Sequence, residues 1–155
     1  MLLRVYLDTS VVGGCFDAQF QAASNQLFAE FSQGKKIAII SDLLLLEMEE
    51  APAEVKAKLA SIPGIHQRRV FLGMEAIELA AAYLKEGIVA ESSLSDARHI
   101  AIASVERADV LVSWNFAHIV NLGRIRQYQA VNLLMGYPPL EIRSPKEVLN
   151  EDKSA

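Results

Sequence analysis

Short apolar runs alternate with longer amphipathic segments along this chain. Residues 2–7 contain five apolar side chains, and residues 37–40 and 110–112 are entirely apolar. Runs of this length are typical of strands that are buried on both faces of a parallel sheet. Other segments repeat apolar side chains at helical intervals, which predicts helices over residues 18–33, 43–50, 74–86, 94–107 and 118–134. Strands that alternate with helices in this way indicate an α/β fold with a central parallel sheet.

Shorter signals complete the predicted order of elements. Residues 11–16 contain two glycines and are expected to form a connection, and Pro52 is expected to open a further helical segment. Residues 69–72 and 140–142 favour two short strands. The sequence Ser144-Pro145-Lys146-Glu147 has the pattern of a capping box, with proline at the first helical position. A last helix is therefore expected near the C-terminus.

Length and composition limit the classes of protein that fit. A chain of 155 residues is expected to form one domain, here residues 1–150, with a frayed tail at residues 151–155. The hydrophobic fraction of 52% argues against disorder. A formal net charge of −4 gives no general reason to expect a nucleic-acid partner, because such proteins are usually basic. A local basic surface is left open by the 15 lysine and arginine side chains.

Cysteine content and hydropathy indicate the compartment. Cys15 is the single cysteine, so the chain has no internal disulfide, which fits a reducing environment. Arg4 and Asp8 interrupt the only early apolar run, so a secretory signal is not expected. No stretch approaches the roughly 18 uncharged apolar residues that a membrane-spanning helix needs. We therefore expect a cytoplasmic protein that makes no use of a membrane.

Polar side chains follow the predicted strands where a ligand would bind. Asp8 ends the first apolar run, Asn115 follows the run at 110–112, and Asp96 opens the helix that leads into that run. In open α/β sheets, ligands bind beyond the carboxyl ends of the strands, and helix starts face the same edge. Glu47 lies in an apolar helix after the second strand and can join this group, because an isolated buried carboxylate is costly. Asp8 could instead turn the chain or cap a helix.

Oxygen-bearing groups in this number suit a hard cation. Mg²⁺ is bound by carboxylates and waters, and Mn²⁺ accepts the same donors. Structural zinc does not fit, because the three histidines are scattered and there is one cysteine. His99 lies one turn from Asp96, and a packed side chain is the simpler interpretation than a general base. Trp114 is likewise interpreted as a buried anchor rather than a surface for stacking a base. A Mg²⁺ site of this kind can activate a water that attacks a phosphodiester.

These residues resemble a known family when they are taken in order. The similarity is carried by Leu7-Asp8-Thr9-Ser10-Val11, then Glu47, then Asp96-Ala97-Arg98-His99-Ile100-Ala101-Ile102-Ala103, then Leu111-Val112-Ser113-Trp114-Asn115-Phe116-Ala117-His118-Ile119. Together they resemble the PIN domain family, and within it the VapC-like toxins of prokaryotic type II toxin–antitoxin systems. The resemblance spans nearly the whole chain. It implies a three-layer α/β/α fold, a Mg²⁺- or Mn²⁺-dependent endoribonuclease acting on RNA, a homodimer, and inhibition by a cognate antitoxin.

The resemblance also implies roles for individual residues. Asp8, Glu47 and Asp96 match the acidic metal site of the family, and Asn115 stands where many members carry a further Asp. Asn keeps a carbonyl oxygen but loses a negative charge, so a second metal would need substrate phosphate to complete its site. Thr9 and Ser113 are expected to orient ligands or waters by hydrogen bonding.

The sequence is also compatible with two alternatives to a nuclease. A PIN-like domain that binds RNA or a partner protein with little or no catalysis is favoured by the missing charge at Asn115. A phosphotransfer domain fits less well, because Ser10 stands where haloacid-dehalogenase-type phosphatases need a second Asp. Response-regulator receivers also require an adjacent acidic pair and a late lysine that the chain does not present.

Overall fold

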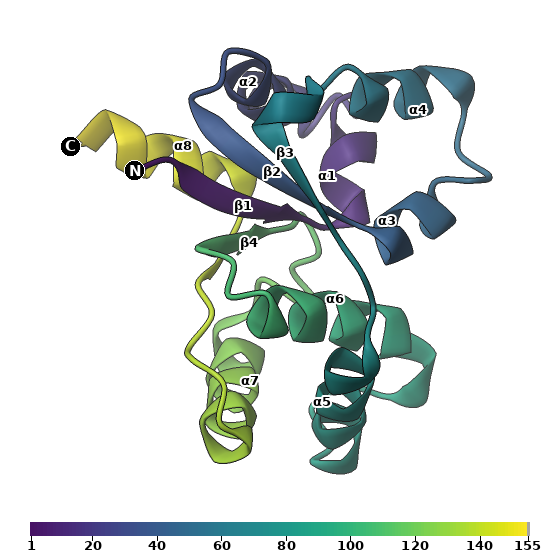
Figure 1. Ribbon diagram of the computed structural model, residues 1–155, viewed down its shortest axis with the longest axis vertical. Helices are drawn as coiled ribbons and strands as arrows, with labels where there is room; N and C mark the ends of the chain where they lie inside the picture. The colour runs from purple at the N-terminus through teal and green to yellow at the C-terminus, as the bar shows by residue number, and fades with distance from the viewer. Residues whose placement is uncertain (155) are drawn as a thin grey trace.

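Five parallel strands form the centre of the molecule (Figure 1). A computed structural model describes residues 1–154, with side chains described for residues 1–149. The strands are β1 (Leu3–Leu7), β2 (Lys36–Ser41), β3 (Gln67–Val70), β4 (Val110–Val112) and β5 (Ile142–Arg143). Their order across the sheet is β3-β2-β1-β4-β5, so the predicted parallel sheet is confirmed, with β1 at its centre.

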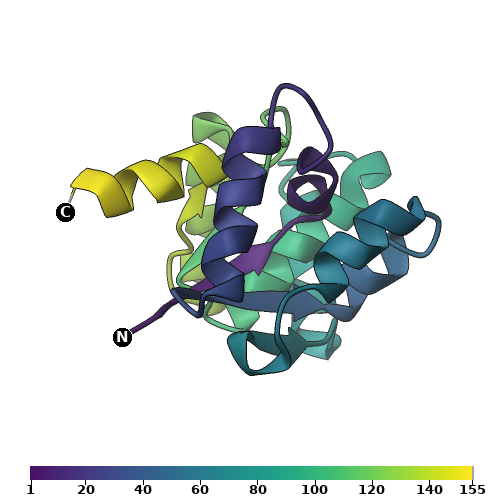
Figure 2. The same cartoon turned by 90° about the horizontal axis from the view of Figure 1, so that it is seen from above.

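The helices form two layers, one on each face of the sheet. Figures 1 and 2 show α2 and α8 side by side over one face, with α1 and α4 in the same layer, and α5, α6 and α7 on the other face. The predicted three-layer α/β/α fold is therefore confirmed. The bounds are α1 (Thr9–Gly14), α2 (Gln21–Ser32), α3 (Asp42–Glu47), α4 (Ala53–Ala60), α5 (Met74–Lys85), α6 (Leu94–Val105), α7 (Leu122–Met135) and α8 (Pro145–Ser154), with 3-10 turns at Gly64–His66 and Glu91–Ser93.

Alternation along the strands divides the core into two halves. Val5 and Leu7 of β1 pack into the cluster beneath α1, α2 and α4, whereas Tyr6 between them packs into the cluster beneath α5, α6 and α7. Successive side chains of a strand point to opposite faces, so a strand with helices on both sides must be apolar at nearly every position. This explains why the strands appear in the sequence as continuous apolar runs.

Two predicted elements differ from the structure near the site. The segment expected to be a connection over residues 11–16 is mostly helix, because α1 begins at Thr9 and ends at Gly14. The helix expected from residue 118 begins only at Leu122. Asn115 accepts the backbone N–H of His118, and Asn121 caps α7, so the chain between them forms a turn. Side-chain capping overrode the apolar periodicity there.

The C-terminal helix begins with the predicted capping box. Ser144 and Glu147 form it, and each side chain accepts the other residue's backbone N–H. The helix α8 continues to Ser154, and Ala155 lies outside the described residues. The frayed tail expected at residues 151–155 stays a prediction. No helix within residues 1–154 is both long enough and apolar enough to span a bilayer.

The strand order creates a topological switch point beside β1. The chain runs from β1 to β2 and β3 on one side and then crosses to place β4 on the other side of β1. The connections leaving the carboxyl ends of β1 and β4 therefore go to opposite faces of the sheet, and ligands of open α/β sheets bind at such points. Asp8 follows β1 and Ser113 follows β4, so both lie at this switch point.

Trp114 fixes the loop after β4 to the helices above the sheet. Its ring stacks on Phe20 with a centroid separation of 4.3 Å, and its indole N–H donates to Ser24 Oγ at 2.9 Å. Its backbone N–H donates to Ser10 Oγ at 2.9 Å. Gly14 leaves room for this ring, because a Cβ at Gly14 would lie 2.7 Å from both Trp114 Nε1 and Ser24 Oγ. Trp114 is thus the packed anchor that the sequence indicated.

Gly14→Ala is expected to lower the free energy of unfolding by about 1–3 kcal/mol, the usual cost of overpacking a tight core position. Gly13→Ala is the matched control, because a Cβ there meets nothing within 4 Å. Urea denaturation of both variants measures the difference. Equal stability of the two variants would contradict the close packing of Trp114 against α1.

Candidate functional site

Asp8 is a buried carboxylate held by hydroxyls that follow two neighbouring strands. It directly follows β1, and its residue is 5% exposed. Ser10 Oγ and Ser113 Oγ both donate to its Oδ2, each at 2.7 Å, and its backbone N–H donates to Val112 O at 3.1 Å. Asp8 occupies the N-cap position of α1, but its side chain makes no capping hydrogen bond. The carboxylate is therefore held by the two serine hydroxyls and does not serve to start the helix.

The two serine hydroxyls also fix the loop that follows β4. Ser10 Oγ accepts the backbone N–H of Trp114, and Ser113 Oγ accepts the backbone N–H of Asn115, each at 2.9 Å. Each hydroxyl thus joins Asp8 to the loop at 113–115. Ser113 orients the Asp8 carboxylate from the loop after β4, and Ser10, which the sequence did not indicate for this role, does the same from α1.

Glu47 reaches the same edge from the end of α3. Thr9 Oγ1 donates to its Oε1 at 2.7 Å, Ser95 Oγ donates to its Oε2 at 2.9 Å, and His99 Nε2 lies 2.5 Å from Oε1. Partial burial tends to raise the pKa of Glu47, but the hydrogen bond and electrostatic attraction of His99 and the two hydroxyls outweigh it and lower the pKa. Glu47 is therefore ionised at neutral pH.

Asp96 lies in the first turn of α6 and faces Asp8. Burial raises the pKa of Asp96, and the negative charge of Asp8 raises it further, while His118, His99 and the hydrogen bond from Asn115 act in the opposite direction. Asn115 Nδ2 donates to Asp96 Oδ2 at 3.3 Å, and its Oδ1 accepts the N–H of His118 at 3.0 Å. The amide oxygen of Asn115 is thus engaged by the backbone, and its N–H group is what faces the carboxylate.

The site chemistry fits a hard cation whose shell is completed by water. Among the described residues, no three His, Cys, Asp or Glu side chains are arranged as a metal-binding group. Mg²⁺ however uses one or two carboxylates and keeps several waters. Asp8 Oδ1 accepts no hydrogen bond from the described side chains, and the repulsion between Asp8 and Asp96 is what a cation would remove. Asp8 and Asp96 are the residues best placed to hold it.

All six residues predicted from the sequence lie at one edge of the sheet, and hydrogen bonds link them in two groups. The first group runs from Asp8 through Ser113 and Asn115 to Asp96. The second group is the pair Glu47 and Thr9. Their roles as metal ligands and catalytic groups stay predictions.

Sequence reasoning understated the contribution of His99. We interpreted it as a packed side chain, and the structure places its ring between Glu47 and the hydroxyl of Tyr6. Its position three residues after Asp96 on the same helix was the available signal, because residues at that spacing share a face. The apolar surroundings of that helix made packing the simpler interpretation.

Three solved structures with the same architecture come from one group of proteins. No protein-family model matches the sequence, and no curated protein matches it significantly. A chain of the VapBC2 complex of Rickettsia felis, bound to a promoter DNA fragment, matches with a TM-score of 0.57 and 12% identity, covering 92% of this chain and 98% of that one. The VapC20 toxin of Mycobacterium tuberculosis, which cleaves the sarcin-ricin loop, matches with a TM-score of 0.55 and 17% identity, covering 74% and 92%. This chain has the fold of the VapC toxins.

A third structure agrees with this assignment. A chain of the DNA-bound VapBC complex of Salmonella typhimurium has a TM-score of 0.53 and 16% identity, covering 93% of this chain and 99% of that one. The three identities are low, so the similarity establishes a VapC-like PIN fold, as the sequence resemblance implied. The VapC-like fold places the acidic residues of this chain at the carboxyl edge of its sheet.

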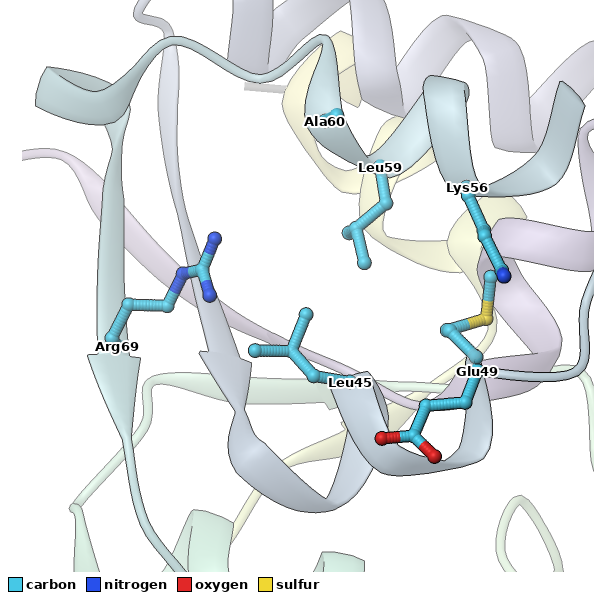
Figure 3. A pocket seen from close by; sticks show the side chains of 7 residues that line it. Leu45, Glu49, Lys56, Leu59, Ala60 and Arg69 are labelled. Carbon is cyan, nitrogen blue, oxygen red and sulfur yellow. The ribbon is translucent and has the colours of Figure 1, made fainter. Parts of the chain in front are cut away.

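A separate hollow of about 290 Å³ lies between α3, α4 and β3 (Figure 3). Leu45 and Leu59 point into it, Arg69 reaches in from β3, and Glu49 and Lys56 lie at the opposite side. None of the six predicted site residues lines it. The hollow is therefore distinct from the acidic edge, although α3 contributes residues to both.

In the metal-free protein at neutral pH, Asp96→Asn is expected to raise Tm by about 2–4 °C, the shift that about 1 kcal/mol produces in a chain of this size. The variant removes the repulsion with Asp8. Because the pKa of Asp96 is raised in the folded protein, its ionisation costs stability as pH rises, and the gain should shrink as pH falls and Asp96 takes up a proton.

Thermal unfolding in EDTA at several pH values measures this gain. Asp109→Asn is the control, because it removes the same charge from a carboxylate that accepts the backbone N–H of Arg4, before β4 and away from the site. A lower Tm for Asp96→Asn than for the wild type would contradict the unfavourable contact with Asp8.

Proposed function

We propose that this chain is a metal-dependent endoribonuclease and the toxin of a toxin–antitoxin pair. The observation that carries the proposal is that Asp8 and Asp96 lie at the same edge of the sheet. Asp8 is buried, and its charge adds to the effect of burial in raising the pKa of Asp96. Two like charges placed in this way add nothing to the stability of the fold, and a bound cation would relieve their repulsion. The VapC-like fold supports RNA as the substrate class.

Residues of the chain have distinct tasks in this proposal. Asp8 and Asp96 would hold Mg²⁺ or Mn²⁺, with Glu47 as the third carboxylate of the site. When bound, the cation would supply a Lewis acid and lower the pKa of a coordinated water, which can then attack a phosphodiester. Ser10 and Ser113 keep Asp8 in place, and the N–H group of Asn115 keeps Asp96 in place. Asn115 would itself become a ligand only with its oxygen freed from the N–H of His118.

Charge explains why the cation is needed for substrate binding as well. The chain carries a formal net charge of −4, and the site itself presents three carboxylates. Such a surface repels the phosphates of RNA. A divalent cation held by Asp8 and Asp96 would offset most of this negative charge where the scissile phosphate binds.

Protein partners form part of the same proposal. Two of the similar structures are VapBC complexes, which supports a cognate antitoxin for this chain. Leu46 of α3 is 61% exposed next to Glu47 and would be covered by such a partner. A homodimer is also proposed, because Leu133, Leu134 and Met135 at the end of α7 are exposed together. Light scattering of the purified protein tests for the homodimer, and the same measurement with any small protein found encoded beside its gene tests for the antitoxin.

Asp8→Asn is expected to lower RNA cleavage by about 100-fold or more, because it removes the charge that holds the cation. The assay uses a panel of RNAs with Mg²⁺, Mn²⁺ or EDTA. Asp109→Asn is the matched control, since it removes one negative charge at the opposite edge of the sheet and should cleave like the wild type. Equal cleavage by the wild type and Asp8→Asn, or cleavage that persists in EDTA, would rule out the proposed reaction.

A second candidate is a VapC-like domain that binds RNA or a protein without cleaving RNA. The orientation of Asn115 favours it, because the amide oxygen is engaged by the backbone and lends no support to a cation. Calorimetric titration with Mn²⁺ separates the two functions. Saturable binding in the millimolar range or tighter favours the nuclease, and its absence favours the binding domain.

A further inference from the structure

His99 connects the buried face of the sheet with the acidic site. Its residue is 1% exposed, and both ring nitrogens have partners. Nδ1 lies 2.6 Å from the hydroxyl of Tyr6, and Nε2 lies 2.5 Å from Glu47 Oε1. The Tyr6 hydroxyl also lies 3.0 Å from Ser41 Oγ, which accepts the backbone N–H of Leu44 at 3.0 Å. A continuous buried chain of polar groups therefore runs from the end of β2 to the carboxylate of Glu47.

The chemistry of Glu47 fixes the hydrogen on His99. An ionised carboxylate only accepts hydrogen bonds, so the contact with Glu47 requires that Nε2 carries a hydrogen and donates it. Nδ1 can either accept or donate, because the hydroxyl of Tyr6 does both. The hydrogen bond made by one ring nitrogen influences whether the other carries a hydrogen. The contact of Nδ1 with Tyr6 also fixes the orientation of the ring, so that the Nε2–H group points at Glu47.

The same N–H group also lies close to Asp8. His99 Nε2 is 3.9 Å from Asp8 Oδ1, so one donor faces two carboxylates that repel each other. Glu47 is the last residue of α3, and its side chain is 30% exposed, which leaves it free to rotate into water if it is not held. Thr9 and Ser95 contribute hydroxyls to it, and His99 is the buried and rigid member of the three.

We propose that His99 is a positioning residue that holds Glu47 beside Asp8 and so prepares the site for a divalent cation. This inference rests on the proposed function. A general base is the competing role, but a base must have a nitrogen free to take a proton from water. Both nitrogens of His99 are engaged by protein groups, so the ring orients a carboxylate instead.

Two substitutions of similar size distinguish the contact that Nε2 makes from the contact that Nδ1 makes. In His99→Gln, the longer side chain places an amide near the position of Nε2, where its N–H can still reach Glu47. In His99→Asn, the shorter side chain places the amide near Nδ1, where it reaches Tyr6 only. If His99 acts only through packing, the two substitutions should change Mn²⁺ affinity equally. If His99 positions Glu47, His99→Gln should largely preserve the affinity and His99→Asn should not.

Calorimetric titration of the full chain with Mn²⁺ is the first measurement. We expect His99→Asn and His99→Ala to weaken Mn²⁺ binding by about tenfold or more and His99→Gln by less than about threefold, in line with the effect of residues that orient metal ligands. Ser104→Ala is the matched control. It removes a buried polar group from the same helix α6, and its hydroxyl bonds Ile100 O and Asn132, away from the site. Its Mn²⁺ affinity should equal that of the wild type.

The second measurement detects the hydrogen directly. Nitrogen NMR of metal-free protein labelled at histidine should show a hydrogen on Nε2 of His99, and sequential assignment of the wild-type spectrum identifies its signal among the three histidines without any variant. An Nε2 without a hydrogen would overturn the inference even if every variant fails to fold.

The outcomes distinguish this inference from the proposed function. Equal Mn²⁺ affinity in the wild type, His99→Asn and His99→Gln would overturn the positioning role and leave the nuclease proposal standing. Equal losses in His99→Asn and His99→Gln would assign His99 to packing. A wild-type protein that takes up no Mn²⁺ would overturn the proposed function and this inference with it.

Discussion

The candidate site depends on bringing two like charges, Asp8 and Asp96, to the same edge of the sheet, where the charge of Asp8 acts on Asp96. Proximity to Asp8 raises the pKa of Asp96 beyond the effect of burial alone. The strand order supplies the geometry, because β4 crosses to the far side of β1 and brings its loop beside Asp8. Hydroxyls from Ser10 and Ser113 then hold one carboxylate, and an amide from Asn115 holds the other. Unfavourable local electrostatics of this kind are typical of functional sites.

The remainder of the fold supplies the stability that the site lacks. Two apolar clusters pack on opposite faces of the sheet, and β1 contributes to both. The loop after β4 carries Ser113 and Asn115, and the stacking of Trp114 on Phe20 keeps it rigid. Site residues therefore come from loops and helix ends, while the elements that position them are buried and apolar. This division lets the candidate site hold like charges near each other without loosening the fold.

Much of this arrangement could be predicted from the sequence. Apolar runs located β1, β2 and β4, and the rule that ligands bind beyond the carboxyl ends of strands brought Asp8, Asp96 and Asn115 to one edge. Short elements were harder, since α1 begins directly after β1 and its two glycines suggested a loop. The orientation of individual side chains could not be predicted from the sequence. The amide of Asn115 turns its oxygen to the backbone, and the ring of His99 joins Glu47 to Tyr6, because of contacts between residues far apart in the chain.

The central claim is that Asp8 and Asp96 together hold a divalent cation. Anomalous diffraction from crystals soaked in Mn²⁺ tests it most directly, because the scattering of Mn²⁺ locates the ion independently of the protein atoms. The account predicts a peak within bonding distance of carboxylate oxygens from both residues, with water completing the coordination. A saturating soak that gives no peak at this edge of the sheet, or a peak bound by other side chains alone, would contradict it.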